Sequence, residues 1–465
     1  MGERLTGADA AWLHMDRPTN RMVVNMVAWF DTEPDWGALR TALQQRWVDA
    51  YPRLRQHVKE PLLPIAPWGV PEWEDHPGFD IDEHLVSAEL DAPGDEAALH
   101  AYVESHITDP LRPDRPLWSI HFISGYRNSS GGLGGAVLLR ANHALGDGFA
   151  LMHAVMALAD HDDRRPEQGP AALIEPPIDS ETGVSGLESV REYIADGVSN
   201  VAGLLRGNLE LSRKAAARIA SLAKLAVVQQ DAKTPLREKL GPKKRVTWST
   251  TVPVDAVRAR AKETGATVND VLLATVGAAM GRYLRQHGSE VEGLGFMLPF
   301  NLRPLDQPMP RRLGNMFGLV YPTIPVGPMD ADRRIGLVHD VMTRIKLAKQ
   351  ANVVFTWVSS VGLTPAPIEN VLIDRYAGMS SLIVTNVPGP KHRISIAGSE
   401  VTGLLFWVPT SGPVGVGLSL ISYAGDLTIG IYVDAMLVPD LDGLRSLIDD
   451  ELSVFRSEKQ AATAG

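Results

Sequence analysis

The stretch that decides the fold is GAVLLRANHALGDGFALMHAVMALA, residues 135–159. It opens with a short apolar run, Val137–Leu139, that is typical of a β-strand. Two glycines then break the run, and from Phe149 onward apolar residues recur at helical spacing. Asp147 lies directly before that helix, where its carboxylate can accept the free N–H groups of the first turn. The stretch therefore predicts a strand, a loop and a capped helix in succession.

A histidine stands in that predicted loop. The loop glycines beside His143 let another molecule approach, and a neutral imidazole in such a place can act as a general base. An ordinary loop histidine with satisfied hydrogen bonds explains the same local pattern, and Asp147 alone reads as a helix cap. Both interpretations of His143 stay open until the rest of the chain is considered.

Length and composition set the general class. A chain of 465 residues is too long for one ordinary core, and 45% hydrophobic with 22% charged residues is usual for a globular protein. The net charge of −10 argues against a general nucleic-acid binder. Without cysteine there is no disulfide, thiolate metal site or cysteine nucleophile. The sequence has neither a signal-peptide pattern nor an apolar run long enough for a transmembrane helix, so we expect a cytoplasmic protein.

Strand and helix patterns alternate in both halves of the chain, which predicts an α/β (α+β layered) fold with mixed sheets flanked by helices. We expect an N-terminal domain over 1–183, a helical linker or crossover over 184–240 and a C-terminal domain over 241–465. Among the predicted elements are single strands at Phe79–Leu85 and Gly318–Val326.

The predicted crossover has a basic side. Its second half carries five cations against the single acid Glu210: Arg206, Arg213, Lys214, Arg218 and Lys224. Such a helix can lie on an anionic membrane surface, or it can pack on the protein with its charges in solvent. The sequence leaves these two alternatives open.

Several enzyme classes are disfavoured because their motifs are missing. The chain has no G-x-S-x-G, no H-E-x-x-H, no G-x-x-x-x-G-K-[ST] and no close His/Asp cluster with metal-ligand spacing. We therefore predict neither a serine hydrolase nor a metal site. His143 is the remaining candidate for catalysis.

Residues 142–148, NHALGDG, resemble the H-H-x-x-x-D-G motif of the CoA-dependent acyltransferase superfamily. Further stretches resemble the bacterial wax ester synthase/diacylglycerol acyltransferase family in particular, and they occur in the family's order over almost the whole chain. These stretches are LTGAD (5–9) with Trp12-Leu13, FDIDEH (79–84), DRPLW (114–118), VNDVLLA (268–274) and TNVPGP (385–390).

The resemblance implies two chloramphenicol-acetyltransferase-like domains with the active site in a tunnel between them. It implies transfer of a fatty acyl group from acyl-CoA to diacylglycerol or a long-chain alcohol, giving triacylglycerol or wax ester. No cofactor would be bound permanently, since acyl-CoA is a co-substrate. The motif's second histidine, the catalytic base, corresponds to His143. Such an enzyme would associate peripherally with the inner membrane face or lipid inclusions.

The resemblance also suggests supporting residues. Asp147 and Gly148 match the motif, and Asp147 is expected to hold the loop through a cap or an arginine partner. Asn142 departs from the motif, because the family usually has a histidine there. An amide cannot serve as a base, although it can donate and accept hydrogen bonds. Asn142 is therefore either a structural replacement or a change in substrate preference.

Two further motifs each allow two interpretations. Asn269 and Asp270 open a helix, where they either cap it or support the active site. Pro116, Leu117 and Trp118 begin the strand that is expected to pair with the motif strand, where they either shape the tunnel or pack in the core.

Two alternative functions remain. The chain could be an acyltransferase of the same superfamily that acts on a specialised metabolite or uses a carrier-protein donor. It could also be a non-catalytic member that binds lipid, a reading that rests on Asn142.

Overall fold

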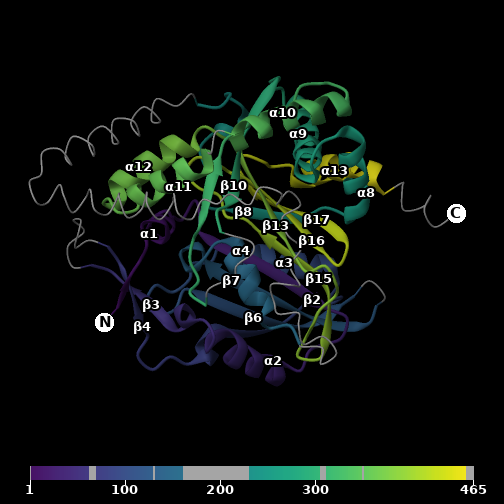
Figure 1. Ribbon diagram of the computed structural model, residues 1–465. Helices are drawn as coiled ribbons and strands as arrows, with labels where there is room; N and C mark the ends of the chain where they lie inside the picture. The colour runs from purple at the N-terminus through teal and green to yellow at the C-terminus, as the bar shows by residue number, and fades with distance from the viewer. Residues whose placement is uncertain are drawn as a thin grey trace, which may run out of the picture.

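In the computed structural model the chain forms two lobes, each built on one β-sheet (Figure 1). The structure describes residues 2–61, 70–128, 131–160, 230–303, 311–347 and 350–456. Within these ranges no helix has both the length and the apolar character needed to cross a bilayer. The predicted mixed α/β architecture with helix-flanked sheets is confirmed.

The first lobe contains a six-stranded sheet, which carries the β7 strand of the motif at its centre. In spatial order its strands are β14 (Ser395–Ile396), β15 (Ser399–Trp407), β2 (Val23–Phe30), β7 (Leu133–Asn142), β6 (Trp118–Arg127) and β5 (Leu85–Glu89). Around it lie α2 (Trp36–Ala42), which continues as a π-helix (Leu43–Val48), α3 (Glu96–His106) and α4 (Gly148–Met156). A small sheet has the order β1 (Glu3–Arg4), β4 (Glu72–Asp75), β3 (Gln56–Lys59).

The second lobe contains an eight-stranded sheet with helices α8, α9, α10 and α13 above it in Figure 1. Its main order is β11 (Phe317–Val320), β10 (Gly293–Asn301), β13 (Leu382–Pro388), β16 (Val416–Tyr423), β17 (Asp426–Asp434) and β8 (Lys244–Trp248); β12 (Thr323–Pro325) pairs with β10, and β9 (Val252–Pro253) pairs with β17. The helices are α8 (Val254–Thr264), α9 (Val268–Gln286), α10 (Ala331–Leu347) and α13 (Leu441–Leu452).

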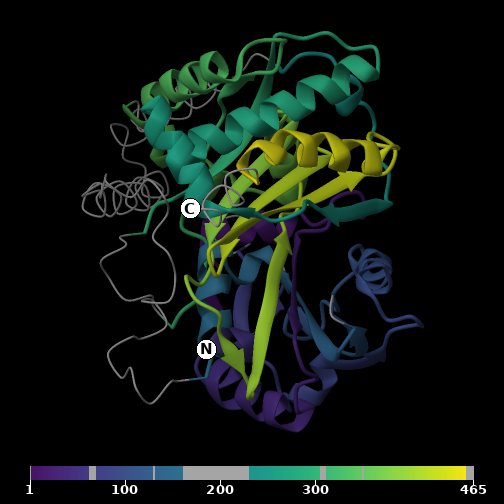
Figure 2. The same ribbon diagram turned by 90° about the vertical axis from the view of Figure 1, so that its right-hand side faces the viewer.

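The two lobes exchange chain segments. After β13 the chain descends from the upper lobe, and β15 runs back up toward it paired with β2, so that β14 and β15 complete the sheet of the first lobe (Figure 2). The predicted division into 1–183, 184–240 and 241–465 therefore does not separate the two sheets. Residues 161–229, which hold most of the predicted crossover and its basic side, lie outside the described residues.

A third apolar cluster joins the N-terminal helix α1 (Gly7–His14) to α11 (Gln350–Val361) and α12 (Ala366–Ala377). Helices α1 and α11 approach so closely that a Cβ on Gly7 would lie 1.9 Å from the carbonyl oxygen of Ser359. Glycine is required at this contact because any side chain would collide with backbone. Neither α11 nor α12 was predicted from the sequence, although both line the site described below.

Two predicted strands differ from the structure. Phe79–Leu85 was expected to be a strand, but Ile81–His84 forms a 3-10 turn because Asp80 accepts a hydrogen bond from the Asp82 N–H at 3.0 Å. Gly318–Val326 was expected to be one strand and is divided into β11 and β12, both antiparallel to β10.

Candidate active site

His143 lies where β7 ends, in the loop that the sequence predicted between a strand and a helix. A 3-10 turn, His143–Leu145, connects β7 to α4. The turn is held by the His143 N–H, which donates to the Met22 carbonyl at 2.7 Å, and by the Asn142 side chain, which accepts from the Ala144 N–H at 2.9 Å. The backbone around the imidazole is therefore fixed from two sides.

One side chain determines which imidazole nitrogen is protonated. Nδ1 of His143 lies 3.0 Å from Oδ1 of Asn315, and Nδ2 of Asn315 donates to Oδ1 of Asp9 and to the His143 carbonyl, each at 2.9 Å. Both partners of Nδ2 can only accept hydrogen bonds, so the amide oxygen must face the imidazole. Nδ1 therefore carries the proton, and Nε2 is left with its lone pair.

Asp9 fixes the amide in turn. It is fully buried on α1 and also accepts from the Asn315 backbone N–H at 2.9 Å. The guanidinium of buried Arg53 forms an ion pair with its second oxygen at 3.1 Å. A buried carboxylate needs such partners, because an unpaired charge in the interior is costly. Arg53, Asp9, Asn315 and His143 thus form one connected chain across both lobes.

The imidazole is enclosed by aromatic rings. Trp12 stacks on His143 with 4.4 Å between ring centroids, and Phe317 lies 5.7 Å away. Burial lowers the pKa of His143 below its usual 6.5, because removal from water disfavours the imidazolium form; the charge of Asp147 and the contact with Asn315 oppose this in part. The ring is held neutral at physiological pH, which a general base requires.

Asp147 binds partners other than His143. Its carboxylate caps α4 by accepting from the Ala150 N–H at 2.9 Å, as the sequence predicted. It also forms an ion pair with Arg303 at 2.5 Å and accepts from the Met316 N–H at 2.9 Å. Arg303 is the arginine partner that the sequence could not identify. Asp147 therefore ties the motif loop to the segment that carries Asn315.

Gly148 allows a close contact between the lobes. A Cβ built on it would lie 3.2 Å from Cγ2 of Val387, within the TNVPGP stretch at the end of β13. That distance is tighter than ordinary van der Waals contact, so a side chain at Gly148 would push the two motifs apart.

The Asn142 side chain binds Asp16 and the loop backbone and makes no contact with the imidazole of His143 among the hydrogen bonds of the described residues. Besides accepting from Ala144, it donates through Nδ2 to Asp16 at 3.3 Å. Asp16 also binds Arg21 at 2.9 Å and the Met22 N–H at 3.2 Å. The amide thus satisfies both hydrogen-bonding requirements of the position without a second imidazole.

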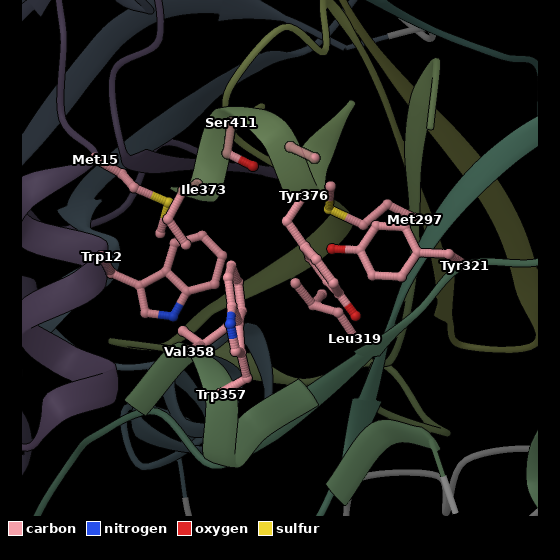
Figure 3. A pocket seen from close by; sticks show the side chains of 11 residues that line it. Trp12, Met15, Met297, Leu319, Tyr321, Trp357, Val358, Ile373, Tyr376 and Ser411 are labelled. Atoms are coloured by element: carbon pink, nitrogen blue, oxygen red, sulfur yellow. The ribbon is translucent and has the colours of Figure 1, made fainter. Parts of the chain in front are cut away.

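A small hollow lies against Trp12, the ring that stacks on His143 (Figure 3). Helix α1 supplies Trp12, and Met15 follows directly after its end; α11 and α12 supply Trp357, Ile373 and Tyr376. Its lining is almost wholly apolar, and its volume of about 10 Å³ accommodates no more than roughly one water molecule. The hollow is thus an apolar space immediately behind the imidazole stack.

The segment Pro116–Trp118 packs in the core of the first lobe. The Trp118 ring stacks on His84 at 4.4 Å and donates through Nε1 to the Leu54 carbonyl at 2.8 Å. The Leu117 carbonyl accepts from the Asn142 N–H at 2.9 Å, which fixes the end of β7. None of the three residues lines the hollow, so their contacts support the core-packing alternative.

Asn269 and Asp270 lie at the start of α9, on the helical side of the second lobe. Asp270 and Thr267 cap each other reciprocally, and Oδ2 of Asp270 lies 2.8 Å from Nδ1 of His339. Within the described ranges, the hydrogen bonds of Asp270 reach no residue around His143. Its contacts are those of a helix cap.

Four polar residues of this site were not predicted from the sequence: Asn315, Arg303, Arg53 and Asp9, although Asp9 lies within the quoted LTGAD stretch. Asn315 and Arg303 are 172 and 156 positions from the residues they bind. Within the described residues, no group of three His, Cys, Asp or Glu side chains could hold a metal ion.

Two family models match the chain. Residues 5–272 match the wax ester synthase/diacylglycerol acyltransferase catalytic domain, and residues 313–455 match the C-terminal domain of the same family. Among curated proteins, a probable diacylglycerol O-acyltransferase of Mycobacterium tuberculosis is 26% identical over 462 residues, covering 97% of this chain and 95% of the relative.

Solved structures share the fold at low sequence identity. The wax ester synthase/diacylglycerol acyltransferase from Marinobacter aquaeolei VT8 superposes with a TM-score of 0.64 at 18% identity, covering 97% of this chain and 98% of that one. The first condensation domain of the calcium-dependent antibiotic synthetase gives a TM-score of 0.61 at 16% identity, covering 97% and 96%. Both superpositions show that the two-lobed fold is shared with these structures.

Proposed function

The chain belongs to the wax ester synthase/diacylglycerol acyltransferase family, and we propose that His143 is the general base of its acyl transfer. The protein is an enzyme that transfers an acyl group to diacylglycerol or an alcohol. The observation that carries the proposal is the hydrogen bond between Nδ1 of His143 and Asn315, because it leaves the lone pair on Nε2.

The proposed reaction uses acyl-CoA as the acyl donor. An alcohol is a weak nucleophile, so Nε2 of His143 takes the hydroxyl proton while the alcohol oxygen attacks the thioester carbonyl. The C–S bond then breaks, and the same Nε2–H returns the proton to the departing CoA thiolate, whose free thiol has a pKa of about 8.5. The products are an ester and free CoA, and no covalent enzyme intermediate is needed.

We assign positioning roles to the residues around the imidazole. Asn315, oriented by Asp9, keeps the proton on Nδ1. Asp147 holds the loop through Arg303 and takes no part in proton transfer, because its oxygens are occupied by other partners. Asn142 is a structural replacement for the first histidine of the motif, since it caps the turn from the side of the loop that faces Asp16.

The hollow beside Trp12 is the proposed site for the apolar part of a substrate near the reacting carbonyl. Its aromatic and aliphatic lining suits the first carbons of an aliphatic chain once the side chains move apart to admit them, and each buried methylene then contributes about 0.8 kcal/mol. Since the acceptors are poorly soluble in water, we further propose that the enzyme works at the surface of the inner membrane or of lipid inclusions. Vesicle flotation tests that location.

An activity panel tests the proposed chemistry. Purified protein is given palmitoyl-CoA with hexadecanol or diacylglycerol, and the release of free CoA is measured. His143→Ala should reduce turnover by at least about a hundredfold. His153→Ala, in the same stretch but on α4, is the matched control and should keep turnover near that of the unchanged protein. Full turnover in His143→Ala would refute the proposed base, and bound acyl chains without CoA release would favour a non-catalytic lipid binder.

A further inference from the structure

An open groove of about 560 Å³ lies on the surface of the second lobe, beside the hollow. It lies between the C-terminal half of α10, the connection from β11 to β12 and the start of α11. Its apolar lining comes from Tyr321, Pro322, Val341, Ile345 and Val353, and among the described residues Arg344 is the one charged side chain in the lining. Its volume falls within the range of about 300–1,000 Å³ that is common for small-molecule sites.

Tyr321 stands between the groove and the hollow, because the residue lines both. On the inner side it lies edge-on against Tyr376 with 4.9 Å between ring centroids, and Figure 3 shows its hydroxyl directed into the hollow. Groove, Tyr321, hollow and Trp12 therefore follow one another from the protein surface to the imidazole of His143.

The hollow is too small to hold a long substrate chain by itself. A space for one water molecule cannot hold a fatty chain, so any long chain that reaches His143 must displace side chains and continue elsewhere. Met15 and Met297 in the lining can adapt, because methionine is unbranched and flexible. The groove shares Tyr321 with the hollow and is itself largely apolar.

We propose that the groove binds the distal part of a long aliphatic chain whose reacting end lies at His143, and that Tyr321 turns aside to connect the two spaces. A largely apolar lining fits an alkyl chain, whose burial is favourable. The chain belongs either to the acyl group or to the acceptor. This inference rests on the proposed function for the position of the reacting end, whereas its binding test does not.

Because the protein has no cysteine, a single reporter can be placed at will. Val353→Cys places a fluorescent label at the groove, where Val353 is 45% exposed. Val371→Cys is the matched control, on α12 outside the groove and 67% exposed. A nitroxide-labelled hexadecanol should quench the label at position 353 saturably and in competition with unlabelled hexadecanol. Equal quenching at both positions, or none at 353, would overturn the proposal.

Kinetics then distinguish the two sources of the chain. Val353→Asp places a charge in the groove, and it should raise the KM of one long-chain substrate by about tenfold while the short-chain analogue of that substrate is unaffected. If the KM rises for hexadecanol but not for a short alcohol, the groove binds the chain of the acceptor. If the KM rises for palmitoyl-CoA but not for acetyl-CoA, the groove binds the acyl chain. Val371→Asp should change neither, and an equal effect of Val353→Asp on long and short substrates would refute the site.

Failure of the proposed function gives a different pattern. An inactive protein that still shows saturable quenching at position 353 would retain the groove as a lipid site and refute only the acyl transfer. An active protein without that quenching would refute only the groove.

Discussion

Trp12 contacts both the motif loop, where it stacks on His143, and the hollow, which it lines. The loop is held by directional polar interactions, whereas the hollow is formed by apolar packing. In the loop His143, Asn142 and Asp147 are each held by hydrogen bonds or ion pairs of defined direction. The hollow is walled by apolar and aromatic side chains that meet through packing alone, such as Trp357 and Tyr376 at 4.4 Å between ring centroids. Directional bonds fix one geometry for the chemistry, whereas packing allows the space for a substrate to vary.

Removal of a directional bond should have the largest effect. Asn315→Leu keeps a similar volume but removes the acceptor for Nδ1–H of His143, so we expect kcat to fall by about a hundredfold or more. KM should change much less, because Asn315 does not line the hollow. Steady-state kinetics with hexadecanol measures both. A large rise in KM with kcat unchanged would contradict the positioning role.

The pH dependence of kcat/KM tests whether Asn315 acts through the imidazole of His143. Burial lowers the pKa of His143 below 6.5, so the base stays neutral below that pH, and activity should be lost only as the pH falls through the lowered pKa. Asn315→Leu removes the contact with Nδ1 that partly opposes this lowering of the pKa, so it should move the acid limb of kcat/KM to still lower pH. An unchanged acid limb would mean that Asn315 does not act through the imidazole.

Asp147 should matter more for stability than for chemistry. Asp147→Ala removes the α4 cap and leaves Arg303 buried without its carboxylate partner, which costs about 3–5 kcal/mol in the free energy of unfolding. Denaturant titration measures the loss. Asp82→Ala, which breaks an exposed pair with Arg40, is the control and should change stability little. A smaller loss in the double variant of Asp147 and Arg303 than in the sum of the single variants would confirm the coupling.

In the hollow, a change of shape should alter selectivity. Trp357→Leu enlarges the space, so we expect the ratio of kcat/KM between long and short acyl chains to change by about tenfold. Trp36→Leu is the control because Trp36 stacks on Phe122 in the first lobe, away from the hollow. Both substitutions should lower the melting temperature, but only Trp357→Leu should alter the chain-length profile.

This division also explains what the sequence could predict. The strand, the loop, the Asp147 cap and the place of His143 follow from residues that are neighbours in sequence. Asn315 and Arg303 reach the loop from the other half of the chain, and a single asparagine or arginine has no local pattern that would indicate such a partner. The tautomer of His143 could therefore not be derived without the fold.

The missed helices have a different physical reason. The sequence of α11, QANVVFTWVSSV, is rich in β-branched residues and has no charged pairs, so its intrinsic helix propensity is low. It is helical because one side packs on α1 and β11, through contacts such as the glycine approach at Gly7. Tertiary packing outweighs propensity in the segment that shapes the hollow.

Substitution of Asn142 should have the smallest effect on turnover among the loop residues. Its side chain bonds Asp16 and the Ala144 N–H and makes no bond to Asn315. Asn142→Ala removes the cap of the 3-10 turn and should cost about 0.5–2 kcal/mol in stability, while turnover should fall by less than about tenfold. Asn142→His restores the histidine usual in the family and should leave turnover within a few-fold, because Nε2 of His143 already carries the lone pair. A loss in Asn142→Ala as large as in His143→Ala would instead place Asn142 in contact with the reacting atoms.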